Sequence, residues 1–205
     1  MKIRSKSPHD MLLKGINPIV KFLILSDILV VSSNGMIGPF FALLVSDFIV
    51  GANALVVSIA IGAYLISRSI IQIPIAQLID KIKGEKDDFY LMIIFSLISS
   101  LIPLFYLLIK TPLHLYLVQI VLGITTAITY PSYMAIFTRH IDKHKEGTEW
   151  GIYYTLTDVG SAGFAILAGY LVEYHGFINL ILSVVIIGVI GSLFLAPIKY
   201  YLTKK

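Results

Sequence analysis

The chain contains no cysteine and little charge, and both absences restrict what it can be. Without Cys in 205 residues, neither a disulfide framework nor a thiolate metal site can form. Charged residues make up 14% of the chain and hydrophobic residues 57%, so no segment is polar enough for a soluble domain. The P-loop, GxSxG and HExxH motifs of soluble enzymes are also missing. We therefore predict that the protein is not an enzyme and needs no cofactor.

Two further functions are disfavoured by the way the polar residues are placed. His140 and His144 stand four apart beside Asp142 and Glu146, but a solvated loop explains them better than a metal site does. The net charge of +4 comes from basic residues outside the apolar stretches, where they can lie against anionic lipid. We therefore predict no metal site and no nucleic-acid partner.

Six apolar stretches occupy most of the sequence, which has a mean hydropathy of +0.87. A helix rises about 1.5 Å per residue, so roughly 20 apolar residues cross the hydrocarbon core of a bilayer. The stretches of that length are Phe22–Leu44, Ala54–Ile79, Phe89–Ile109, Leu113–Thr138, Trp150–Val172 and Phe177–Ile198. We predict an all-α, polytopic membrane protein whose six-helix domain, residues 18–198, lies between basic segments at 1–17 and 199–205. The first stretch is expected to be retained, because it is too long for a signal peptide.

Basic residues predict the orientation of the chain, because Lys and Arg accumulate on cytoplasmic loops. The alternate loops on one side carry Lys110 alone. The termini and the remaining loops carry Lys2, Arg4, Lys6, Lys14, Lys81, Lys83, Lys86, Arg139, Lys143, Lys145, Lys199, Lys204 and Lys205. This bias of thirteen to one predicts an inner or plasma membrane protein with both termini in the cytoplasm.

Three charged residues lie deep within the predicted spans, where charge is costly and usually functional. Asp27 and Asp158 are each about 13 Å from the cytoplasmic end of their helix, and Arg68 is about 18 Å from it. They form either an interhelical ion pair that stabilises the bundle or a functional site. Because Arg68 with one Asp would already be neutral, the second Asp favours a site for a proton or cation.

Polar neighbours share a helix face with these charges, since positions three, four and seven apart are adjacent on a helix. Spans one, two, four and five carry such stripes, so we expect them to face a polar interior, with spans three and six against lipid. The predicted substrate contacts are Asn34, Tyr64, Gln72, Gln119, Thr126, Tyr130 and Tyr154.

The ends of spans two and five resemble each other. Ala76, Leu78 and Asp80 precede Gly84, while Gly169, Leu171 and Glu173 precede Gly176, so both segments read small residue, Leu, acid, then Gly. The charge rule places the two segments on opposite sides of the membrane. Spans one to three and four to six are therefore predicted to be inverted copies, an arrangement found in transporters.

The loop after span two resembles a signature of the major facilitator superfamily, Gly-x-Leu-x-Asp-Arg-x-Gly-Arg-Lys. The matching residues here are Ala76, Leu78, Asp80, Lys81, Gly84 and Lys86. Span four resembles a second signature, Arg-x-x-Gln-Gly, with Gln119 where the family often has Arg, then Gly123, Tyr130 and Pro131. The resemblance covers the whole chain, which has six spans where family members normally have twelve.

This resemblance implies half of a major-facilitator-type fold and a secondary active transporter that works by alternating access. Asp27, Arg68 and Asp158 would couple transport to a proton or ion, and Ala76, Asp80, Lys81, Gly84 and Lys86 would form a cytoplasmic gate. Because polar faces need cover in lipid, we predict a parallel homodimer that moves a small solute. The alternatives are a membrane accessory subunit that transports nothing and one half of a heteromeric transporter.

Overall fold

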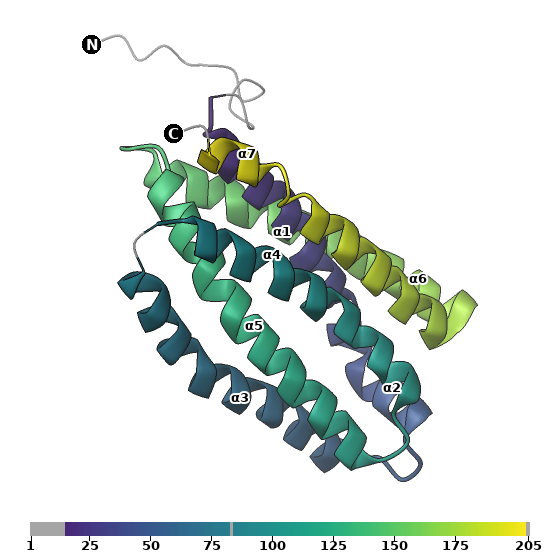
Figure 1. Ribbon diagram of the computed structural model, residues 1–205. Coiled ribbons are helices and arrows are strands. Elements are labelled where there is room, and N and C mark those ends of the chain that lie inside the picture. The colour runs from purple at the N-terminus through teal and green to yellow at the C-terminus, as the bar shows by residue number, and fades with distance from the viewer. Residues whose placement is uncertain (1–14, 83, 204–205) are drawn as a thin grey trace.

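The computed structural model describes residues 15–82 and 84–203, and this part of the chain contains helices and no strand. The predicted all-α class is confirmed. The elements are α1 (Pro18–Ile37), η2 (Gly38–Phe40), α2 (Phe41–Phe48), α3 (Ala54–Lys81), α4 (Lys86–Leu101), η3 (Ile102–Leu108), α5 (Pro112–His140), α6 (Glu146–Leu193) and α7 (Ile198–Thr203) (Figure 1). Most of the basic segment 1–17 and the end of the tail 199–205 lie outside the described residues, so the division into segments stays a prediction.

Three helices begin at a polar side chain that caps their first turn. Asn17, Asn53 and Thr111 accept hydrogen bonds of 2.9, 3.1 and 3.4 Å from backbone N–H groups at the starts of α1, α3 and α5. Pro18 and Pro112 occupy the first position of α1 and α5, where a missing N–H costs nothing. The caps satisfy backbone donors that would otherwise be exposed near lipid.

Within residues 15–82 and 84–203, five helical segments are long and apolar enough to cross a membrane. Four of them, 18–48, 54–81, 86–108 and 112–140, correspond one to one with predicted spans. The fifth, Glu146–Thr203, has 58 residues, which is about 87 Å of helix and nearly three times the hydrocarbon thickness. The six-span count therefore depends on whether this segment bends.

α6 does bend, at Gly176. This residue has φ 77° and ψ 173° inside an otherwise helical run, a conformation that is essentially restricted to glycine. The ribbon of α6 folds back between its green first arm and its yellow second arm (Figure 1). Gly84, at the other end of the predicted repeat, also has a positive φ, of 133°. The bend at Gly176 divides α6 into two arms, as the predicted fifth and sixth spans require. The six-span count and the inverted repeat stay predictions.

The helices pack as two pairs joined by a third element. α1 packs mainly against α6, and α3 mainly against α5, whereas α4 contacts both α5 and α6. In Figure 1 α3 lies beside α5 on one side of the bundle, away from α1 and α6. The bundle therefore has two walls, α1/α6 and α3/α5, with α4 connecting them.

Small polar residues make the contact between α4 and α6. The Ser192 hydroxyl lies 2.7 Å from the Ser96 hydroxyl and 3.1 Å from that of Ser100, and all three side chains are buried. A Cβ on Gly188 would come within 3.1 Å of the Ser100 side chain. Lipid provides no hydrophobic driving force between helices, so small residues and interhelical hydrogen bonds stabilise such contacts.

The first and last described segments lie at one end of the bundle, together with the basic loops. The rings of Phe22 and Tyr201 lie 6.0 Å apart, and Lys145 donates to the Gly15 carbonyl at 3.4 Å. Arg139 at the end of α5 pairs with Asp88 at the start of α4. An even number of crossings would bring these segments to one side of the membrane. That this side is the cytoplasm stays a prediction from the charge bias.

Candidate functional site

A cavity of about 650 Å³ lies between the two helix walls. This volume is typical of a site for a small molecule. Its lining comes from α1, η2, α2, α3, α4, η3, α5 and α6. Six of the twelve tyrosines of the chain line it, namely Tyr64, Tyr106, Tyr130, Tyr133, Tyr153 and Tyr154. Tyrosines of membrane proteins often lie at the membrane–water interface. Half of the tyrosines in this chain line the cavity instead.

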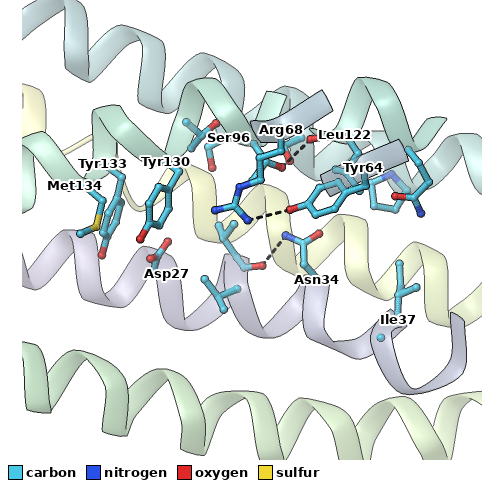
Figure 2. Close-up of a pocket in the computed structure, with 18 of the residues that line it drawn as sticks. Asp27, Asn34, Ile37, Tyr64, Arg68, Ser96, Leu122, Tyr130, Tyr133 and Met134 are labelled. Carbon is cyan, nitrogen blue, oxygen red and sulfur yellow. Dashed lines mark hydrogen bonds between the residues drawn. The ribbon is translucent and has the colours of Figure 1, made fainter. Parts of the chain in front are cut away.

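Asp27 provides the negative charge of the cavity, from the α1/α6 wall. Its Oδ2 accepts a hydrogen bond of 2.9 Å from the Tyr153 hydroxyl on α6. Tyr133 on α5 lies close to it in Figure 2, and the Tyr133 hydroxyl is buried. Asp27 is thus held by a neutral donor, and a second donor is in place beside it.

Arg68 provides the positive charge, from the α3/α5 wall. Its Nε donates to Gln72 Oε1 at 3.1 Å and its Nη1 to the Tyr64 hydroxyl at 3.4 Å. Its guanidinium carbon lies 5.2 Å from the centre of the Tyr130 ring, which is a cation–π distance. Figure 2 shows the guanidinium pointing between these two tyrosines. No acidic side chain in residues 15–82 and 84–203 lies within 4.0 Å of Arg68.

The predicted solute contacts mostly meet at this cavity. Asn34, Tyr64, Gln119, Thr126, Tyr130 and Tyr154 line it. Gln119 is buried and donates to the Tyr106 hydroxyl at 3.0 Å, so a tyrosine on η3 fixes its amide. Gln72 does not line the cavity; it orients Arg68 instead.

Asp158 lies apart from the other two charges. It is exposed on α6 and does not line the cavity. It shares a helix face with Tyr154, four residues earlier, which does line the cavity and is 57% exposed. The Asp158 carboxylate therefore stands beyond the edge of the cavity, on a surface that a single chain leaves uncovered.

The expectation that span three lies outside the polar interior is wrong. Ser96 and Ser99 on α4, with Pro103 and Tyr106 on η3, line the cavity. Span three carries no charged stripe, but its serines are buried and face the gap between the two walls. A serine row is a weak signal in an apolar helix, because serine also serves close helix packing.

Glycines fix each wall next to its charged residue. A Cβ on Gly123 of α5 would lie 2.5 Å from the Tyr64 carbonyl oxygen and 3.2 Å from the Arg68 nitrogen. On the other wall, a Cβ on Gly160 would lie 3.0 Å from Ile28, the residue after Asp27. Backbones that approach this closely have little freedom to slide. The position of Arg68 is therefore set by backbone packing, and that of Asp27 by the close fit of the Ile28 side chain against Gly160.

The residues predicted as a gate lie at the basic end of α3. Asp80, Lys81, Gly84 and Lys86 are exposed, and Ala76 is half-buried. The backbone carbonyl of Gly84 accepts a hydrogen bond of 3.4 Å from Arg139. The α3–α4 loop is thus tied to the end of α5 within one chain.

Sequence reasoning missed the ion pair that makes this tie. Arg139 pairs with Asp88, whose side chain is buried, and His140 lies 3.6 Å from Glu85. Nearby in the α5–α6 loop, a hydrogen bond to Asp142 raises the pKa of the Lys145 ammonium. The sequence did contain a signal for this ion pair. Asp87 and Asp88 stand at the start of span three, and Arg139 and His140 stand at the end of span four, on the same side of the membrane.

Comparison with known families agrees with the motifs found in spans two and four. A family model described as the Major Facilitator Superfamily matches residues 23–205. No curated protein sequence matches the chain. The matched region includes the whole cavity, and the chain is half the size of full transporters of that superfamily.

Proposed function

Because the chain belongs to the major facilitator superfamily, whose members are membrane transporters, we propose that it is a secondary active transporter driven by a proton or another ion. The observation that carries this proposal is that Asp27 and Arg68 line one cavity from opposing walls without an ion pair between them. Charges that served only to hold helices together would need close mutual contact to offset their desolvation. Separate charges leave both groups available to a ligand.

The proposed cycle is alternating access around the cavity. Asp27 carries the coupling proton or cation, and Arg68 binds an anionic group of the solute. The expected solute contacts are Asn34, Tyr64, Gln119, Thr126, Tyr130 and Tyr154. In transporters built from repeats, the site stays near the midplane while bundles rock around it.

A second copy of the chain is the proposed cover for the open side of the cavity. Asp158 is exposed on α6. Only 6% of an 18-residue apolar stretch of α3 is buried within the protomer. A carboxylate exposed to hydrocarbon costs several kcal/mol. A parallel second copy, related by an axis along the membrane normal, would cover both features and close at two protomers.

Cysteine crosslinking tests this assembly. Leu65 on α3 and Ala162 on α6 are both exposed, and each stands about 24 Å from the basic end of its helix. In membranes that contain protomers with Leu65→Cys and protomers with Ala162→Cys, we expect mixed dimers to crosslink. Ile94→Cys on the exposed face of α4 is the matched control. Crosslinks through Ile94 alone, or a monomer by native mass spectrometry, would contradict this assembly.

The gate residues lead to a separate prediction. Asp80 is exposed at the end of α3, where its carboxylate could meet the positively polarised N-terminus of α6 in a partner copy. Asp80→Asn is expected to favour the inward-open state, so single cysteines along the first arm of α6 should be labelled faster from the cytoplasmic side. Asp47→Asn, an exposed acid at the other end of the bundle, should leave labelling unchanged. Equal labelling in both variants would argue against this gate.

Solute uptake into proteoliposomes that contain only this protein tests the proposed function. Vesicles with an imposed pH gradient are incubated with a mixture of small solutes, and the retained compounds are identified by mass spectrometry. Retention of a solute that depends on the protein and the gradient supports the proposal. No retention in vesicles with folded protein would favour an accessory subunit or a half that needs a different partner.

A further inference from the structure

Arg68 has more donor capacity than its surroundings use. A guanidinium carries five N–H groups, and the described residues accept two of them, through the side chains of Gln72 and Tyr64. Both acceptors are neutral, and Tyr130 adds only the face of its ring. Arg68 lies about 20 Å from the basic end of α3. At that depth in the membrane a charge without a counter-ion is costly. An anion that binds in the cavity would supply that counter-ion.

We infer, on the basis of the proposed transport function, that the solute is an aromatic monocarboxylate, bound through its carboxylate to Arg68 and carried together with one proton on Asp27. The planar fork of Arg matches a carboxylate in two parallel hydrogen bonds. The aromatic body would lie among the tyrosines between the two walls. The cavity volume of about 650 Å³ accommodates a molecule of one or two rings.

Charge balance explains why a proton accompanies the anion. The empty cavity contains one positive and one negative side chain, Arg68 and Asp27, among the described lining residues. Binding of a monoanion alone leaves one uncompensated negative charge at membrane depth. Transfer of one proton from bulk water to a carboxylate oxygen of Asp27 restores neutrality, and the same O–H bond breaks on the other side. The loaded and empty cavities are then both neutral.

Asp27 is assigned as the proton carrier because none of the groups around it is another carboxylate. Tyr153 on α6 donates to it, Tyr133 and Tyr130 on α5 face it (Figure 2), and Arg68 faces it from α3 across the cavity. The lining residues from α4 are serines, which do not titrate. Asp27 is thus the one carboxylate that lines the cavity in the described part of the chain.

Thermal unfolding in detergent tests the solute class directly, through a panel of small aromatic probes. The probes are benzoate, phenylacetate and indole-3-acetate, their uncharged amides, and 2-phenylethylamine. We expect the carboxylates to raise the melting temperature saturably, and the amides and the amine to leave it unchanged. Arg68→Gln should weaken carboxylate binding about 10- to 100-fold, the loss typical of a hydrogen bond to a charged group. Lys110→Gln, which removes an exposed cation at the far end of the bundle, should bind as the wild type does.

The outcomes separate this inference from the proposed function. Stabilisation by the amine, stabilisation by no probe, or equal carboxylate binding in Arg68→Gln would overturn the inference. Uptake of the stabilising carboxylate into proteoliposomes, with the membrane potential clamped at several values, gives the second readout. Uptake driven by pH and insensitive to potential supports one proton per anion, whereas uptake that changes with potential contradicts it. Uptake of the amine would contradict the inference but not the proposed transport function. Binding of a carboxylate without uptake of any solute would contradict the transport function itself.

Discussion

Replacement of Asp27 by Asn is expected to abolish proton-driven accumulation while solute exchange continues. The wild-type protein, with one proton per solute, should concentrate its solute about tenfold for each unit of pH gradient, because one pH unit corresponds to about 1.4 kcal/mol. The amide of Asn keeps the shape of Asp27 and can still accept from Tyr153, but it carries no proton between the two sides. The accumulation ratio of the variant should therefore fall to about one, as measured by uptake into proteoliposomes across a fixed pH gradient.

Two variants control for this result. Asp47→Asn changes an exposed carboxylate on α2, and it should accumulate solute as the wild type does. Tyr153→Phe removes the hydrogen bond to Asp27 but keeps the carboxylate, so coupling should persist with an altered pH dependence. If Asp27→Asn still concentrated solute with the wild-type pH profile, another group would be the carrier.

Gly123→Leu is expected to separate α3 from α5 and displace Arg68. Even the first carbon of the new side chain would lie 2.5 Å from the Tyr64 carbonyl oxygen, and Ser67, at 2.1 Å, would have to rotate away. Relief from the glycine helix penalty contributes about 1 kcal/mol in favour of the variant. Overpacking of a close contact costs about 1–3 kcal/mol, and a backbone carbonyl cannot move aside as a side chain can. The sum predicts a lower melting temperature and loss of solute uptake.

Gly62→Leu is the matched control on α3. A Cβ at Gly62 meets nothing within 4 Å, so this variant gains the helix preference of leucine without a clash. Its melting temperature should equal or exceed that of the wild type, measured in the same detergent. A drop of equal size in both variants would show that bulk on these helices, and not the contact at Gly123, determines stability.

Sequence patterns predicted the helices well because the membrane imposes a simple rule. Apolar length alone identified 54–81 and 112–140 to within a few residues, since each span must satisfy its own backbone hydrogen bonds. The bend in α6 also falls within the gap between the last two predicted spans, at Gly176. What length cannot predict is how the helices pair, and α1 with α6 and α3 with α5 emerged only from the structure.

The candidate site was predictable only where one helix carries the whole signal. The stripe of Tyr64, Arg68 and Gln72 on α3 forms its hydrogen bonds within that helix, at the i and i+4 spacing. Tyr153 was missed because its partner, Asp27, lies 126 positions away in the chain. Asp158 was grouped with the other charges by depth, but depth does not specify which way a side chain faces the bundle.

The pH inside proteoliposomes that contain only this protein is the most direct test of the central claim, that one cavity couples a solute to a proton. A pH-sensitive dye in the lumen reports proton movement when solute is added outside, in wild-type vesicles and in Asp27→Asn vesicles. We predict a change in luminal pH that depends on solute in the wild type and is absent in the variant. Solute entry without any change in luminal pH, or the same change in both vesicle types, would contradict the claim.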